Sequence, residues 1–146
     1  MRMNLSDLLK QDRVEKFESD KDQIKNELEN ANAKLKSAKN VLAINEWGLA
    51  HTAAYEAMLH AGTALMFSKG YRTKGSEHHA TVVLFVEAVF SAKFSNKDVL
   101  NSFDRARKLR HGRTYDNANL ISPTLAKNLV ENTEVFVNIT KEILKM

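Results

Sequence analysis

One apolar stripe runs through residues 24–42 and limits what the chain can fold into. Its members are separated by four, three, four, three and four residues, which is the spacing of one face of an α-helix. A long coiled coil would use the same spacing, but two alanines in the stripe favour the close packing of an antiparallel bundle. The pattern therefore predicts an amphipathic bundle helix. The stripe consists of Ile24, Leu28, Ala31, Leu35, Ala38 and Leu42.

Residues that punctuate turns are scarce throughout the chain. Five glycines and one proline serve 146 residues, whereas a β-sandwich or barrel needs a turn every ~8–12 residues. The mass of 16.5 kDa suits one domain with a single core. We therefore expect one all-α domain over residues 1–146, an antiparallel bundle of four to five helices. Residues 1–20 are expected to form a short leading helix or arm.

The helix expected over residues 46–69 is central in the bundle, because alanine and larger apolar side chains surround most of its axis. Gly70 is the expected end of this helix, and residues 70–76 are expected to form a loop. Ser76 is the expected N-cap of the next helix, over residues 77–93. The middle of that helix is apolar on nearly all sides, and so short a chain has little left to cover it. We therefore expect a homodimer formed through this helix, which the second subunit covers, and through the basic end of the helix that follows it.

Two further helices complete the expected bundle. Asn96 caps the first of them, and Gly112 loosens or ends it. Residues 113–121 are expected to form a loop. Ser122 and Pro123 then combine an N-cap serine with a proline at the first helical position. This pair predicts the start of a last helix that runs to about residue 145.

Several classes of protein are excluded by what the sequence lacks. Without cysteine there is no disulfide scaffold, no thiolate metal site and no cysteine nucleophile. No phosphate loop, GxGxxG, HExxH or HxE motif occurs, so we expect neither a cofactor nor a metal site. The most apolar run, residues 81–90, is shorter than the ~20 residues that span a membrane. The first residues also lack the apolar stretch of a signal peptide, so we expect a cytoplasmic protein without membrane contact.

Positive charge is concentrated in one part of the chain. The net charge is +4, yet residues 1–46 hold nine basic and nine acidic side chains. Residues 69–113 hold ten Lys and Arg against four Asp and Glu. Such a basic patch attracts phosphate groups. A solvated helix end, where cations interact favourably with the helix dipole, would show the same pattern. The densest cluster is Arg105, Arg107, Lys108, Arg110 and Arg113.

His111 lies inside this basic cluster and is the histidine best placed for acid–base chemistry. An imidazole titrates near neutral pH and can act as a general acid or base. Nearby arginines can hold a phosphodiester and stabilise the charge that develops on it. Arg107 faces the same way as His111, whereas Arg105 reaches the same pocket only if the helix end is distorted or a partner subunit contributes. A charged helix end without chemistry is the alternative.

The other histidines are expected to have structural roles. His51 and His60 lie on opposite sides of their helix and cannot share a ligand. His78 and His79 are expected at the polar start of a helix. Neighbouring helical side chains diverge, which disfavours a metal pair there.

Four stretches of the chain together resemble small prokaryotic HEPN-domain proteins. They are AYEAMLH at residues 54–60, ALMFSKGY at 64–71, KGSEH at 74–78 and LRHGRTYD at 109–116. The resemblance covers about residues 20–145. It implies an antiparallel helical bundle that dimerises, and a cytosolic toxin–antitoxin setting, often beside a minimal nucleotidyltransferase. Many members of the family are metal-independent ribonucleases.

The resemblance also implies roles for individual residues. Active members use an arginine and a histidine separated by four to six residues, and Arg105 and His111 fit that spacing. Ala106 departs from the pattern, because a polar residue usually follows the arginine. Arg110 and Tyr115 match an arginine and a tyrosine that close relatives carry near this helix end, often without a histidine.

The implied function is cleavage of RNA through a 2′,3′-cyclic phosphate without a metal ion. His111 would deprotonate the ribose hydroxyl, and Arg105 would stabilise the phosphorane. The alternative is a non-catalytic HEPN module that binds a nucleotide or RNA and partners a nucleotidyltransferase. The residues expected to hold the substrate are Arg107, Arg110, Arg113 and Tyr115.

Overall fold

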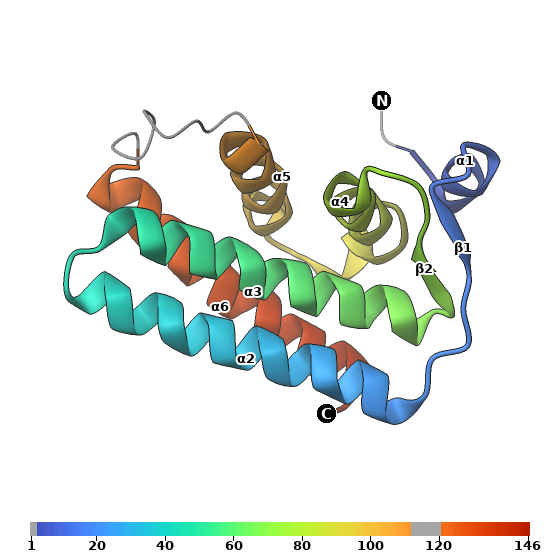
Figure 1. Ribbon diagram of the computed structural model, residues 1–146, viewed down its shortest axis with the longest axis horizontal. Helices are drawn as coiled ribbons and strands as arrows, with labels where there is room; N and C mark the ends of the chain where they lie inside the picture. Colours follow the sequence, from blue (N-terminus) through green and yellow to red (C-terminus); the bar gives the residue numbers. More distant parts are fainter. Residues whose placement is uncertain (1–2, 112–120) are drawn as a thin grey trace.

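The computed structural model describes residues 3–111 and 121–146, which form six α-helices, one 3₁₀ turn and two short strands (Figure 1). The helices confirm the predicted all-α bundle. In chain order the elements are α1 (Leu5–Lys10), β1 (Val14–Lys16), α2 (Lys21–Ala43), α3 (Trp47–Ser68), β2 (Tyr71–Thr73), α4 (His78–Phe90), η1 (Ser91–Lys93), α5 (Lys97–His111) and α6 (Pro123–Leu144).

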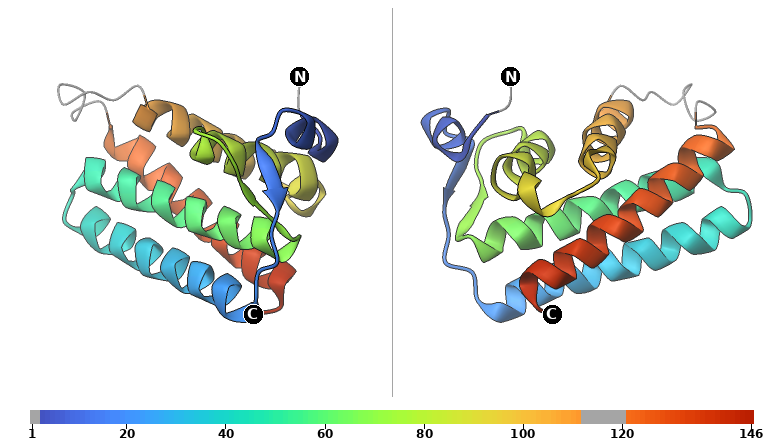
Figure 2. Two further views of the ribbon diagram at one scale, coloured as in Figure 1. Left: turned by 45° about the vertical axis from the view of Figure 1, so that its right-hand side comes forward. Right: turned by 180° about the vertical axis from the view of Figure 1, so that it is seen from behind.

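Three long helices form one layer of the bundle and two shorter ones form the other. α2 and α3 lie antiparallel along the long axis, and α6 crosses them on one side (Figures 1 and 2). α4 and α5 lie on the opposite side of α3 from α2, contact each other, and run across its axis. α3 therefore contacts every other long helix, which places its side chains at the centre of the molecule.

The sequence of α3 explains its central position. Half of its 22 residues are buried, and most of these are alanine, glycine, leucine or methionine. Small side chains let neighbouring helices approach closely. At Gly62 an added Cβ atom would lie only 2.8 Å from Cγ1 of Val82 on α4. Glycine at this position therefore sets how closely α4 packs against α3.

The predicted stripe on α2 is the face that packs into the bundle. Leu28, Ala31, Leu35 and Ala38 are buried, and the two outermost members of the stripe are half-buried. The start of α2 comes from a capping box, in which Asp20 accepts a hydrogen bond from the Gln23 amide at 2.8 Å.

One of the two predicted serine caps is confirmed and the other is wrong. Ser122 accepts a hydrogen bond from the Leu125 amide at 3.0 Å, and Pro123 follows it in the first turn of α6. At the start of α4, Glu77 occupies the N-cap position instead of Ser76, and it makes no capping side-chain bond. The expected helix end at Gly112 and the expected loop at 113–121 lie outside the described residues, apart from residue 121.

The N-terminal segment differs from a simple leading helix. The helix α1 ends at Lys10, where Asp12 follows with a left-handed φ of 59°. β1 then pairs antiparallel with β2, which lies in the segment 70–76 that the sequence suggested was a loop. Gly70, with a φ of 83°, provides the turn between α3 and β2. The two strands tie the N-terminal segment to the start of α4.

The prediction that α4 lacks cover within its own chain is wrong. Val82, Val83, Phe85, Val86 and Phe90 are all buried, with exposed fractions of 4% or less. The cover comes from α1, α3, α5 and β2, which all contact α4. The sequence pattern gave no sign of α1 and β2 folding back over this helix. Leu84 and Val89 are half-buried, so α4 has little apolar surface left for a dimer interface, and the dimer itself stays a prediction.

Across the two described ranges, no helix combines the length and the hydropathy needed to cross a bilayer.

Candidate functional site

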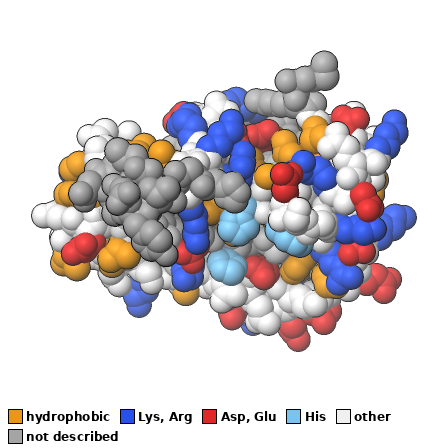
Figure 3. All heavy atoms as spheres, turned by 45° about the horizontal axis from the view of Figure 1, so that its top comes forward, with side chains coloured by type: hydrophobic (Ala, Val, Ile, Leu, Met, Phe, Trp, Pro, Cys, Tyr) orange, Lys and Arg blue, Asp and Glu red, His pale blue; other side chains and the backbone are white. Residues whose placement is uncertain are grey.

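A cleft of about 490 Å³ opens between α3, the start of α4 and α5. Tyr55 comes from α3, His78 and His79 from the first turn of α4, and Arg107 and Arg110 from α5. Figure 3 shows this face, where histidine side chains gather beside a group of lysine and arginine side chains. The cleft thus joins cationic groups to groups that can exchange protons.

Arg110 is held in place by two groups of α3. Its guanidinium carbon lies 5.6 Å from the centre of the Tyr55 ring, and Nη1 lies 3.5 Å from a carboxylate oxygen of Glu56. The side chain remains 41% exposed. A guanidinium has five N–H donors, so an ion pair of this length leaves donors of Arg110 available to a ligand in the cleft.

Arg107 is more buried and more strongly paired. Its Nε and Nη2 donate to the same Asp104 oxygen at 3.3 and 3.2 Å, and its side chain is 19% exposed. Lys108 pairs with the other oxygen of Asp104 at 3.0 Å. Asp104 therefore orients Arg107 and shares its own charge between two cations.

Tyr55 links the arginine side of the cleft to the histidine side. Its hydroxyl lies 2.9 Å from Nδ1 of His79, and the residue is 1% exposed. Burial raises the pKa of Tyr55 to about 12, although Arg110 and then Arg107 pull the pKa down. The phenol is therefore protonated at neutral pH and can donate a hydrogen bond to an unprotonated Nδ1.

The far edge of the cleft is fixed by contacts of the second histidine and its neighbour. His78 Nδ1 is bonded to the Thr73 hydroxyl on β2. Glu77 pairs with Arg13 at 3.2 Å, and Arg13 Nε also donates to the Thr81 hydroxyl at 3.1 Å. The N-terminal segment and β2 thereby position the first turn of α4 beside the cleft.

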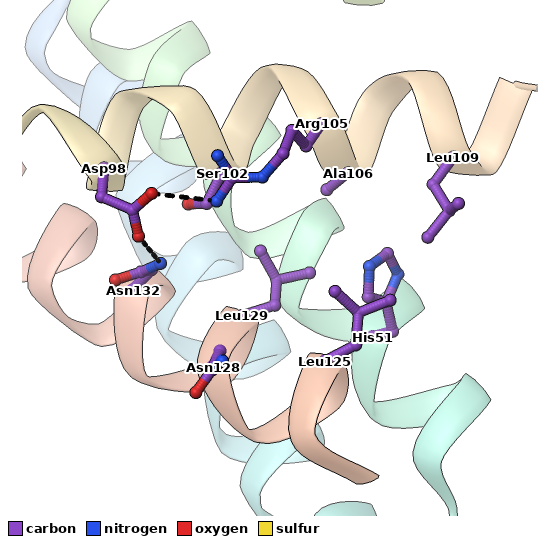
Figure 4. A pocket seen from close by; sticks show the side chains of 10 residues that line it. All are labelled: His51, Asp98, Ser102, Arg105, Ala106, Leu109, Leu125, Asn128, Leu129 and Asn132. Carbon is purple, nitrogen blue, oxygen red and sulfur yellow. Dashed lines mark hydrogen bonds and ion pairs between the residues drawn. The ribbon is translucent and has the colours of Figure 1, made fainter. Parts of the chain in front are cut away.

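Arg105 lies in a different place from Arg107 and Arg110. Its Nη2 donates to Asp98 Oδ1 at 3.0 Å, and the other oxygen of Asp98 is 3.4 Å from the amide nitrogen of Asn132 (Figure 4). These groups line a cavity of about 240 Å³ between α3, α5 and α6, which also contains the buried His51. Two residues along a helix turn the side chain by about 200°. Within one chain, the structure therefore separates Arg105 from the cleft.

Three of the expected site residues are not described by the structure. His111 is the last residue of α5, but its side chain lies outside the described residues, as do Arg113 and Tyr115. Of the six expected residues, the cleft thus brings together Arg107 and Arg110. His60, expected to be structural, bonds Glu27 at 2.7 Å and joins α3 to α2.

Tyr55 and His79 were not identified from the sequence as part of a site. Tyr55 lies inside one of the stretches that carry the family resemblance, and this was the one sequence feature that pointed to it as a site residue. His79 was interpreted as the polar start of a helix. Within the described part of the chain, no group of three or more His, Asp or Glu side chains is placed to hold a metal ion.

Comparisons with known proteins agree with the geometry of the fold. A family model described as the HEPN domain matches residues 24–144. The crystal structure of TT1696 from Thermus thermophilus superposes with a TM-score of 0.64 at 15% sequence identity. The match covers 82% of this chain and 97% of that chain. At this identity the likeness concerns the fold alone. No curated protein matches the chain.

Proposed function

Because the chain belongs to the HEPN family, we propose that it binds RNA phosphates in the cleft and cleaves the strand without a metal ion. The observation that carries the proposal is the composition of the cleft. Two guanidinium groups, two imidazoles and a tyrosine hydroxyl line one cavity. Guanidinium groups bind phosphate through paired charged hydrogen bonds, and imidazoles can transfer protons at neutral pH.

Phosphate binding is expected to rearrange the ion pair of Arg110. The pair between Arg110 and Glu56 is long, at 3.5 Å, and Glu56 also contacts Lys34 of α2 at 3.1 Å. When a phosphate takes over Arg110, Glu56 retains Lys34 as its partner. No carboxylate is then left without a cation, which lowers the cost of the exchange.

The proposed cleavage step uses the hydroxyl of the substrate as the nucleophile. His111 takes the proton from the ribose 2′-hydroxyl, whose oxygen forms a bond to the adjacent phosphorus. The bond from phosphorus to the 5′-oxygen breaks, the leaving oxygen takes up a proton from water, and a 2′,3′-cyclic phosphate remains. Arg105 stabilises the phosphorane. Arg107, Arg110, Arg113 and Tyr115 hold the strand.

The position of Arg105 gives the proposed homodimer a specific role. Arg105 is on the other side of α5 from the cleft of its own chain. A second subunit would have to bring its own Arg105 to the cleft for that residue to contact the phosphorane. The family resemblance implies a dimer and a cytoplasmic toxin–antitoxin setting, and the delivery of Arg105 across that dimer is part of our proposal.

The position of Arg105 outside the cleft also favours a second function. Arg105 is paired with Asp98 and is outside the cleft, so the cleft of one chain holds phosphate-binding groups without this catalytic candidate. The chain would then be a non-catalytic module that binds a nucleotide or RNA and partners a nucleotidyltransferase.

One assay separates the two functions. Labelled RNA of mixed sequence is incubated with the protein and an excess of chelator, and the product ends are identified. Cleavage products with a 2′,3′-cyclic phosphate support the nuclease. RNA that is bound by the protein and stays intact supports the binding module. RNA that is neither bound nor cleaved contradicts the nuclease and the RNA-binding module, and leaves only a module that binds a nucleotide.

A further inference from the structure

We infer that a second cavity, next to the cleft, binds the base of the nucleotide whose phosphate the cleft holds. This cavity of about 330 Å³ lies between α3, β2 and the start of α4. The inference rests on the proposed phosphate binding but not on catalysis. It therefore applies equally to a nuclease and to a nucleotide-binding module.

The two cavities adjoin at a pair of histidines. His78 and His79 line both the cleft and the second cavity. His78 is exposed and His79 is half-buried, so the boundary between the cavities is open to solvent on one side. The proposed nucleotide lies across these imidazoles, with its phosphate in the cleft and its base in the second cavity.

The cleft is lined by charged groups and the second cavity mostly by apolar groups, and a nucleotide likewise has a charged phosphate and a largely apolar base face. The cleft presents Arg107 and Arg110 to an anion. The second cavity is mostly apolar, with Leu59, Met66 and Val82 among its lining residues. A phosphate suits the first environment, and the flat face of a base suits the second, because bases stack on aromatic rings and pack between apolar side chains.

A polar group at the mouth of the second cavity can contact the edge of a base. Arg72 of β2 lines the cavity and is half-exposed, with Nε 3.2 Å from Glu15. Its guanidinium carbon lies 4.9 Å from the centre of the Phe17 ring, and that ring lies 5.1 Å from the ring of Phe67. This stack holds Arg72 in place while other N–H donors remain. Arginine donors match the acceptors O6 and N7 of guanine.

The cavity can be filled at a position whose recorded hydrogen bond lies within its own helix. Thr63 lines the cavity and is half-buried, and its hydroxyl donates to the Leu59 carbonyl of the same helix at 2.8 Å. Thr63→Phe would place a ring in the cavity. Thr124→Phe makes the same change at an exposed position of α6 and serves as the matched control.

The test measures binding of four nucleoside 5′-monophosphates and of ribose 5-phosphate by calorimetry. We expect the tightest nucleotide to bind the parent protein roughly tenfold to a hundredfold more tightly than ribose 5-phosphate. Thr63→Phe should remove this difference and leave binding of ribose 5-phosphate unchanged, whereas Thr124→Phe should behave as the parent. Arg72→Ala, which adds no bulk, should reduce the difference and provides a second variant if Thr63→Phe does not fold.

The outcomes distinguish this inference from the function on which it rests. Equal affinities of nucleotides and ribose 5-phosphate for the parent would overturn the base site and leave the phosphate site intact. So would a base preference that survives in both Thr63→Phe and Arg72→Ala. If neither type of ligand binds the parent, the proposed phosphate binding is wrong and the base site falls with it.

Discussion

The guanidinium carbon of Arg110 lies 5.6 Å from the centre of the Tyr55 ring. The hydroxyl of the same tyrosine lies 2.9 Å from Nδ1 of His79. Tyr55 therefore contacts a guanidinium group from α5 on its face and an imidazole from α4 at its edge. One buried side chain of the central helix thus contacts both the Arg110 guanidinium and the His79 imidazole and holds them on different sides of itself.

The pH dependence of stability should report the burial of Tyr55. Burial raises its pKa from the ordinary value of 10.0 to about 12. Because the pKa is higher in the folded state, the stability that this group contributes is present below pH 10 and is lost as the pH rises towards 12. The loss is on the order of 2–3 kcal/mol. Urea unfolding measured from pH 8 to pH 12 would show it.

Tyr55→Phe is the control for this pH dependence. Lysine side chains also lose their protons in that range, but they do so equally in the parent and in the variant. The difference between the two stability curves should therefore shrink as the pH rises through the window. Two parallel curves would show that the pKa of Tyr55 is not raised.

Arg110→Ala should weaken binding of RNA or a nucleotide. A charged hydrogen bond contributes about 1.5–3 kcal/mol, which corresponds to a loss of roughly tenfold to a hundredfold in affinity. Lys108→Ala is the matched control, because Lys108 is on the same helix and is 66% exposed without lining the cleft. Affinities come from a fluorescence titration over a salt series, in which the parent should bind more weakly as salt rises.

The same titration with Arg105→Ala tests whether a partner subunit brings Arg105 to the cleft. A loss that matches that of Arg110→Ala would indicate that a partner subunit brings Arg105 to the cleft. If Arg110→Ala and the parent bind RNA alike at every salt concentration, the basic cluster is only a solvated helix end.

Gly62→Ala should destabilise the protein, although alanine favours helices. The added Cβ atom would lie 2.8 Å from Cγ1 of Val82, and overpacking of this kind costs about 1–3 kcal/mol. The gain in helix propensity is about 1 kcal/mol. Gly48→Ala, in the first turn of the same helix, is the control and should not lower the free energy of unfolding. Urea denaturation of both variants measures the difference. An unchanged midpoint for Gly62→Ala would show that the overpacking costs no more than the roughly 1 kcal/mol gained in helix propensity.

The parts of the fold that were predicted correctly depend on local signals. The stripe on α2 and the Ser122–Pro123 start of α6 can be recognised within a few residues of sequence. The pairing of Val14 with Thr73 could not, because it joins segments 59 residues apart and neither segment alternates over more than three residues. That pairing, together with α1, supplies the cover of α4 that the sequence did not reveal.

The site was predictable only in part for a similar reason. Helical geometry allowed Arg107 to be separated from Arg105, because their directions follow from spacing on one helix. The contact between Tyr55 and His79 depends on how α4 packs against α3. Gly62 permits that close packing. The sequence shows that a glycine lies within a helix, but not which other helix packs against it.

The proposed homodimer should be detectable in solution. Light scattering at micromolar concentration should give twice the chain mass of 16.5 kDa, with more than ~1,000 Å² of surface buried in total. Because α4 is largely covered within its own chain, the expected interface is reduced to its other predicted part, the basic end of α5. A species of 16.5 kDa would contradict the dimer and would leave Arg105 without a route to the cleft.

His111→Ala should abolish RNA cleavage while most of the phosphate binding remains. A general acid or base contributes about 10²–10⁴-fold to a rate, and the arginines that hold the phosphate are still present in the variant. The measurement is a time course on labelled RNA with parent and variant, with and without chelator. The parent should be equally active in both conditions.

His60→Ala is the histidine control for this last experiment. His60 bonds Glu27 and does not line the cleft, so its loss should leave the cleavage rate close to that of the parent. Equal cleavage by His111→Ala would mean that another group, or a contaminating nuclease, performs the reaction. A loss of cleavage in His111→Ala with full binding would assign the proton transfer to the end of α5. A parent protein that binds varied RNAs and cleaves none would favour the non-catalytic module.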